Sequence, residues 1–221
     1  MTFSTAAAGS PGPTAARAVE RSATRARARA EAEVRALVEA GLAALRRSGS
    51  ADLTVADVLS EAGLSTRAFY RHFSSKDELL LAVYEEEARA SHARLARAVE
   101  ASPSPRAAFE AWVDETLALA YDPRRAKRTR VLAAEGRRAQ AEHPERFDAI
   151  VDGVLEPLRA VLAAGRDDGT FPLAEPDVDA RTVHVIAWAA VEARLAGSGP
   201  DLGAARARVL RFCLPALGAT S

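Results

Sequence analysis

The chain has 221 residues, of which 48% are hydrophobic and only 5% aromatic, and its 30 basic side chains are balanced by 30 acidic ones. This length is sufficient for one large domain or for two smaller domains with their own cores. The single cysteine, Cys213, excludes an internal disulfide framework and any multi-cysteine metal site. No apolar run approaches the ~20 residues of a membrane span, and we therefore expect a cytoplasmic protein.

The composition predicts an all-α fold. Ala, Leu, Arg and Glu are good helix formers and dominate the sequence, and no segment shows the two-residue alternation of a strand. Residues 1–22 lack apolar periodicity and are expected to form a disordered leader. The end of this leader is basic, and the excess continues into the next segment through Arg17, Arg21, Arg25, Arg27 and Arg29. Two interpretations remain open: the solvated start of a helix, or an arm that contacts DNA phosphates or the minor groove.

A first helix is expected over residues 23–48, because apolar side chains recur on one face at three- and four-residue spacing. Thr54 is placed to cap a second helix, with Asp57 as its partner in a capping box. Gly63 suits the left-handed turn that follows that helix. The apolar face of the first helix comprises Val34, Leu37, Val38, Leu42 and Leu45.

A short third helix and a long fourth one follow the glycine turn. Ser65 is placed to cap the third helix, which extends to about residue 73. Ser75 and Glu78 have the spacing of a capping box that opens a fourth helix to about residue 101. Two short helices joined by a tight turn form a helix-turn-helix, which places its second helix in the major groove of DNA.

Five more helices are expected in the remaining sequence, for about nine in total. Prolines and glycines separate segments over residues 105–120, 123–142, 144–165 and 177–196, and a ninth extends through residue 217. The eighth segment is apolar on more than one face through Val183, Val185 and Trp188, so it requires cover on both sides. A second subunit is the expected cover.

From Val34 to Tyr84 the sequence resembles the DNA-binding domain of the TetR family of transcriptional regulators. The resemblance implies an N-terminal helix-turn-helix domain over residues 23–74, and a helical effector-binding and dimerisation domain over residues 75–221. It also implies a homodimer formed through the last two helices, a palindromic operator in double-stranded DNA, and repression as the usual mode. The matching residues are Ala40, Gly49, Thr54, Val55, Asp57, Val58, Ala62, Gly63, Leu64, Ser65, Phe69, Tyr70, His72, Phe73, Ser75, Lys76, Leu79 and Leu80.

The third helix and the starts of its neighbours supply the candidate DNA contacts. Arg67 is the candidate for reading a base, since guanidinium pairs bidentately with guanine. Lys76 stands at a helix N-terminus, where backbone N–H groups already favour an anion such as phosphate. By the resemblance, Tyr70 and His72 correspond to phosphate-contacting positions. The full candidate set is Thr54, Thr66, Arg67, Tyr70, Arg71, His72 and Lys76.

By the same resemblance, the fourth to seventh helices enclose the cavity for a small-molecule effector. We expect an apolar effector, because no cluster of polar residues is evident in the sequence. Neither a metal site nor a cofactor is expected, and His184 is interpreted as a hydrogen-bonded core histidine. The following side chains are either walls of that cavity or ordinary core: Phe109, Trp112, Leu117, Tyr121, Phe147 and Trp188.

The sequence allows two alternatives to a transcriptional regulator, an enzyme and a helical interaction module. An enzyme is disfavoured because the chain has no glycine-rich phosphate loop, no nucleophile elbow and no His-Glu metal spacing. The other alternative is a helical interaction module that no longer binds DNA specifically. The presence of Thr66, Arg67, Tyr70 and Lys76 argues against that module.

Overall fold

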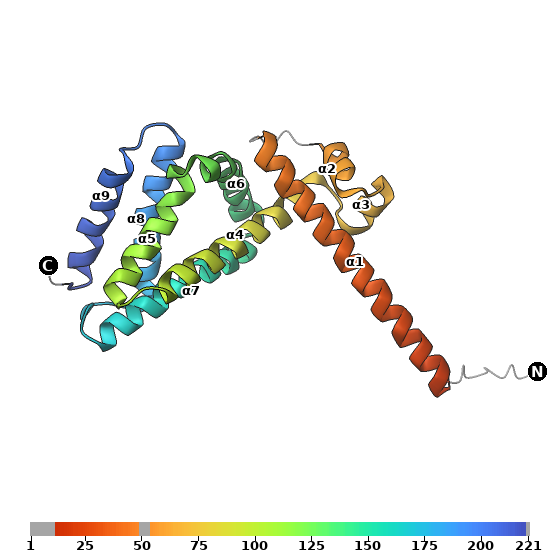
Figure 1. Cartoon of the computed structure of the whole chain (residues 1–221), viewed down its shortest axis with the longest axis horizontal. Coiled ribbons are helices and arrows are strands. Elements are labelled where there is room, and N and C mark those ends of the chain that lie inside the picture. Colours follow the sequence, from red (N-terminus) through yellow and green to blue (C-terminus); the bar gives the residue numbers. More distant parts are fainter. Residues whose placement is uncertain (1–11, 49–53, 220–221) are drawn as a thin grey trace, which may run out of the picture.

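The computed structural model describes residues 12–48 and 54–219, and within these ranges it contains nine helices and no strand (Figure 1). The predicted all-α fold is thereby confirmed. None of the described helices is long and apolar enough to cross a membrane. The helices are α1 (Pro13–Ser48), α2 (Val55–Ala62), α3 (Thr66–His72), α4 (Lys76–Glu100), α5 (Pro105–Tyr121), α6 (Pro123–Glu142), α7 (Pro144–Asp167), α8 (Pro176–Leu195) and α9 (Leu202–Ala216).

The first three helices and the beginning of α4 share one hydrophobic core, which contains Leu37, Leu45, Phe69 and Val83. The turn between α2 and α3 has the predicted geometry. Gly63 adopts a φ of 64°, a left-handed conformation in which a side chain would be strained, and its N–H donates to the carbonyl of Leu59. This turn fixes the angle at which α3 leaves α2.

The capping predictions hold for α2 and in part for α4. Thr54 and Asp57 form the full capping box. At α4, the Ser75 hydroxyl accepts from the N–H of Glu78, as expected. The Glu78 carboxylate, however, binds the backbone N–H and hydroxyl of Ser74, one residue before the expected partner.

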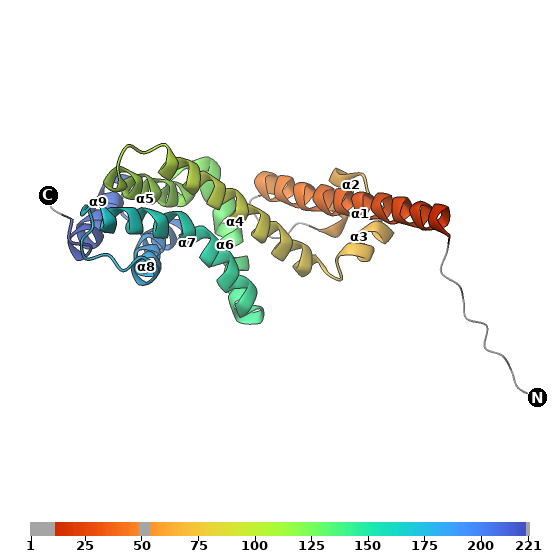
Figure 2. The ribbon, with the colours of Figure 1, turned by 90° about the horizontal axis from the view of Figure 1, so that it is seen from below.

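The second core is built by α5, α7, α8 and α9 with the far end of α4, around Phe109, Trp112, Leu158 and Val191. Figure 2 shows α4 and α6 between this bundle and the unit of α1, α2 and α3. The two cores do not separate at residue 75, because Leu79, Leu80 and Val83 of α4 belong to the first core and Leu95 to the second. One continuous helix therefore connects them.

The main difference from the sequence-based expectation is the start of α1. The helix begins at Pro13, so residues 13–22 of the expected leader are helical. Two features account for this: proline suits the first turn of a helix, and the following Ala, Arg and Glu residues have high helix propensity. Residues 1–11 and Gly49 lie outside the described residues. The exposed first part of α1 continues past α2 and α3 as a single helix (Figure 1).

Candidate DNA interface and effector cavity

Helix α3 separates its side chains into an inner and an outer set. Ala68 and Phe69 are buried in the first core, whereas Thr66, Arg67 and Tyr70 are exposed. Tyr70 is 59% exposed, and its ring packs edge-on against Phe69 with 5.2 Å between the ring centroids. The outer set therefore stands on a rigid base and presents a guanidinium and a phenol to solvent.

Three basic side chains converge on one carboxylate, that of Glu33 in α1. His72 Nε2 lies 2.8 Å and Arg71 Nη2 2.7 Å from Glu33 Oε2, and Arg29 Nε donates to Oε1 at 2.9 Å. The hydrogen bond from His72, followed by that from Arg29, lowers the pKa of Glu33 to about 2. Glu33 is therefore ionised at neutral pH and ties α3 to α1.

This arrangement changes the position expected for His72. Its side chain is only 10% exposed and is turned toward Glu33, so it does not share a surface with Arg67 and Tyr70. Arg71 remains half-exposed at the edge of the outer set while it pairs with Glu33. Sequence reasoning missed Glu33, although this acidic residue stands four positions before Leu37 on the apolar face of α1.

The remaining two candidates lie at helix N-termini. The exposed Thr54 uses its hydroxyl in the cap of α2, donating to Asp57 Oδ2 at 2.7 Å. Lys76 is the first residue of α4 and is partly buried. Both positions present backbone N–H groups that favour an anion.

A cavity of about 530 Å³ lies among α4, α5, α6, α7 and α8, and most of its lining is apolar. Of the six expected wall residues, only Phe147 and Trp188 line it. The hydroxyl of Tyr121 is instead bonded to the carbonyl of Pro200. The other three, Phe109, Trp112 and Leu117, are fully buried in the second core. The side chains of α5 that line the cavity are instead Thr116 and Leu119, on a neighbouring face of the helix.

His184 of α8 lines the same cavity, contrary to the interpretation of a hydrogen-bonded core histidine. Its buried Nδ1 has no hydrogen-bond partner among the described residues. The imidazole stacks on Trp188, with 6.0 Å between the ring centroids, and meets Trp112 edge-on. Burial lowers the pKa of His184 to about 4, so the ring is neutral at physiological pH.

Comparison with known proteins agrees with this architecture. Residues 37–83 match the family model described as bacterial regulatory proteins, tetR family. Residues 37–83 therefore form a DNA-binding domain of the TetR family. A TetR regulator from Haloarcula marismortui is 26% identical with a TM-score of 0.65, over 82% of this chain and 96% of that one.

Two further solved structures share the fold of this chain at lower identity. A TetR-family regulator from Pectobacterium atrosepticum is 22% identical with a TM-score of 0.65, over 84% of this chain and 92% of that one. FadR from Bacillus subtilis, solved with stearoyl-CoA, is 16% identical with a TM-score of 0.61, over 82% and 97%. No protein of curated function matches the sequence significantly.

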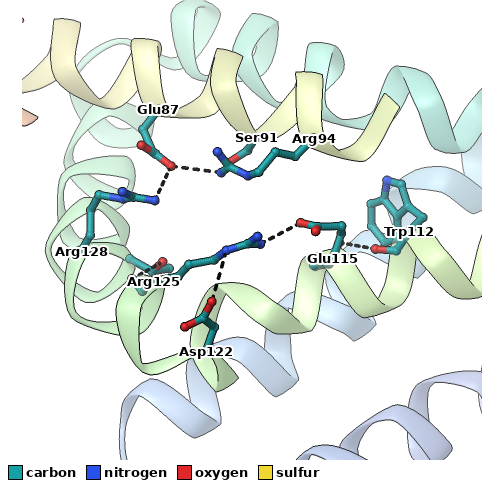
Figure 3. Close-up of polar contacts among 10 residues, drawn as sticks. Glu87, Ser91, Arg94, Trp112, Glu115, Asp122, Arg125 and Arg128 are labelled. Carbon is teal, nitrogen blue, oxygen red and sulfur yellow. Dashed lines mark hydrogen bonds and ion pairs between the residues drawn. The ribbon is translucent and has the colours of Figure 1, made fainter. Parts of the chain in front are cut away.

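The chain also contains a polar cluster that was not expected from its sequence. Arg94 Nη2 and Arg128 Nη2 lie 3.0 Å and 2.9 Å from the same oxygen, Glu87 Oε1, and Arg94 also donates to Ser91 Oγ (Figure 3). Glu87 and Ser91 line the cavity. The sequence did contain a sign of this cluster. Glu87 and Ser91 stand at four-residue spacing between Val83 and Leu95, so they lie on the same face of α4 as these apolar residues.

The cavity shares a wall with the first core. Leu132 of α6 and Tyr84 of α4 line the cavity and also pack against the core of α1, α2 and α3. Two polar contacts strengthen the junction: Arg138 Nη1 lies 2.8 Å from Asp77 Oδ1, and Lys127 Nζ donates to the carbonyl of Arg47. Also on α6, Arg130 donates to the carbonyl of Leu195 and Glu135 pairs with Arg138.

Proposed function

We propose that this TetR-family DNA-binding regulator binds a palindromic operator as a homodimer and represses transcription until a small, largely apolar effector releases it. The observation that supports this most directly is the outer face of α3, where Arg67 and Tyr70 project from a helix anchored by Glu33. A helix held in this way loses little conformational freedom when it enters the major groove.

Within this proposal the candidate residues have different roles. Arg67 reads a base edge, because a guanidinium can bond bidentately to guanine. Phosphates are contacted by Thr66, Tyr70, Arg71 and Lys76, and by the N-terminus of α2 at Thr54. His72 acts indirectly by positioning α3 through Glu33.

The proposed dimer forms through α8 and α9, which carry large apolar side chains on their exposed faces. Val185 is 65% and Phe212 59% exposed in the single chain, and Val178 and Leu202 are exposed on the same two helices. Exposed apolar side chains on adjacent helices are typical of an interaction surface. Two-fold pairing would present two copies of α3 to two half-sites of a palindrome.

The effector site is the cavity among α4 to α8. Because Leu132 and Tyr84 belong both to its wall and to the first core, a ligand that displaces them also displaces the unit that carries α3. Release of DNA then requires that the ligand bind more tightly to the displaced state. A relative of the same fold, FadR from Bacillus subtilis, was solved with stearoyl-CoA, which supports a small molecule as effector.

The test is selection of bound sequences from random DNA, with binding measured at several salt concentrations. We expect a palindromic consensus whose half-sites lie about one helical turn apart. Affinity should fall steeply with salt, because phosphate contacts release counterions. Failure to prefer any sequence over random DNA at moderate salt would contradict the proposal.

A further inference from the structure

Glu87 is the one charged residue in the interior of the cavity, among the residues that the structure describes. The other two charged lining residues, Arg137 and Glu192, lie at the surface, where their side chains are 64% and 48% exposed and 3.7 Å apart. In the interior of the cavity an occupant therefore encounters a single carboxylate, within a mostly apolar wall.

The carboxylate of Glu87 offers an acceptor that the protein itself does not use. Both guanidinium groups, of Arg94 and Arg128, bind Oε1, as the two dashed lines in Figure 3 show. Oε2 makes no hydrogen bond within the described part of the chain. A carboxylate oxygen that has no donor from the protein leaves an acceptor for a hydrogen-bond donor on a bound molecule.

The other polar groups in the interior of the cavity are uncharged. Burial raises the pKa of the Tyr84 hydroxyl to about 12, so this group stays protonated. His184 is neutral and leaves its Nδ1 unpaired. Phe147 and Trp188 provide flat aromatic surfaces. The lining thus suits a planar apolar body with one or two hydrogen-bonding groups.

From this geometry we propose that the cavity takes an uncharged aromatic molecule whose hydroxyl group donates a hydrogen bond to Glu87 Oε2. The inference rests on the proposed function, because it names the chemical class of the effector at that site. A carboxylate ligand would bring like charges together at Oε2. A cation gains little, because two guanidinium groups already compensate the single carboxylate.

Four biphenyl probes that differ only in the group at the 4-position test the proposal by titration calorimetry: 4-phenylphenol, 4-methylbiphenyl, biphenyl-4-carboxylate and 4-(aminomethyl)biphenyl in its ammonium form. A hydrogen bond to a charged group corresponds to about ten- to a hundredfold in affinity. We expect 4-phenylphenol to bind the full chain at least about tenfold more tightly than each of the other three. Equal affinities, or tighter binding of the carboxylate or the ammonium, would overturn the proposal.

Two variants, one at Glu87 and one at Glu192, test whether Glu87 determines the preference among the four probes. Glu87→Gln removes the charge that repels the carboxylate and leaves Arg94 and Arg128 uncompensated. This variant should therefore bind biphenyl-4-carboxylate about tenfold or more tightly than the wild type does. Such a gain cannot arise from partial unfolding. The matched control, Glu192→Gln at the surface, should keep the wild-type order of the four probes, and a Glu87→Gln variant that also keeps this order contradicts the proposal.

Binding of operator DNA without any probe is measured on the same protein by fluorescence anisotropy. A protein that binds its selected DNA but shows no preference for 4-phenylphenol overturns the effector class and leaves the regulator proposal standing. A protein that prefers 4-phenylphenol but binds no DNA sequence specifically overturns the regulator proposal and leaves the chemistry of the cavity standing.

Discussion

His72 Nε2 on α3 and Glu33 Oε2 on α1 are 2.8 Å apart, although the two residues are 39 positions apart in the sequence. This bond fixes the helix proposed to enter DNA relative to the longest helix of the molecule. Arg71 binds the same oxygen at 2.7 Å, so one carboxylate sets both the tilt of α3 and the position of a candidate phosphate contact. The geometry of the surface that we propose faces DNA is thus controlled by a contact between α1 and α3.

Replacing Glu33 by Gln should weaken DNA binding several-fold for all sequences and lower the urea midpoint of unfolding. The physical reason is that His72, Arg71 and Arg29 lose their shared anion. Fluorescence anisotropy with selected and random DNA measures the first effect. Glu31→Gln is the control, since Glu31 pairs only with the exposed Arg27 on the same helix, and this variant should behave as wild type.

The effect of Glu33→Gln on stability should depend on pH. The pKa of Glu33 is about 2 in the folded protein and 4.5 in its ordinary state, so the group stabilises the fold fully above pH 4.5. This stabilisation is lost as the pH falls toward 2. The difference in unfolding free energy between wild type and variant should therefore shrink over that range, and a constant difference would contradict the role of the carboxylate.

His184 predicts a separate dependence on pH. Its pKa is about 4 in the folded protein against 6.5 when free, so the unfolded chain takes up the proton first. The protein should lose about 3 kcal/mol of stability from this group as the pH falls from 6.5 to 4. Urea unfolding at pH 7 and pH 4 should show this loss in the wild type and a correspondingly smaller loss in His184→Gln. Equal losses in the two proteins would refute the assignment.

Arg67→Ala and Lys76→Ala should weaken DNA binding in different ways. Loss of a bidentate contact to guanine costs about ten- to a hundredfold at one base position and relaxes the preference there. Loss of a phosphate contact weakens binding to every sequence alike and reduces the salt slope by about 1. Repeating the sequence selection with each variant separates the two outcomes. If both variants lose affinity without any change in sequence preference, Arg67 does not read a base.

The exposed first part of α1 is expected to contact DNA phosphates. Arg17, Arg21 and Arg25 recur at four-residue spacing on one face and form no ion pair among the described residues. Changing all three to Gln should reduce the salt slope of DNA binding by up to about 3. Arg166→Gln, at the end of α7, is the matched control for lost positive charge. An unchanged slope in the triple variant would show that this part of α1 is only a solvated helix.

Phe212→Arg should separate the proposed dimer into monomers, because it places a charge on the exposed apolar face of α9. Light scattering after size-exclusion chromatography measures the mass, and DNA affinity should fall with it. Ala160→Arg adds the same charge to an exposed position of α7 and should remain dimeric. A Phe212→Arg protein that keeps the dimer mass would exclude α9 as the interface.

Sequence reasoning succeeded where the determinants are local. The boundaries of α2 and α3 follow from Thr54, Gly63 and Ser65, each of which acts on its own turn of backbone. The contacts of Glu33 with His72 and of Glu87 with Arg128 could not be assigned, because in each pair the two residues lie on different helices that only the tertiary fold brings near.

Periodicity also had a limit in the bundle. It identified Phe109, Trp112 and Leu117 as buried, but it does not say whether a buried face meets another helix or a cavity. Periodicity also does not say which apolar side chains remain exposed to solvent in the single chain, as Val185 and Phe212 do.

Leu132 packs in the first core and also lines the cavity, and this has a consequence for the design of chimaeric regulators. A chimaera that joins the DNA-binding unit of one regulator to the effector-binding part of another, at the boundary between α3 and α4, treats the two parts as interchangeable. In this chain such a graft would pair a foreign α6 with the native α1, and the side chain at position 132 would have to fit both the first core and the cavity. A working chimaera should therefore inherit α4 and the Leu132 stretch of α6 from the same parent as its DNA-reading unit.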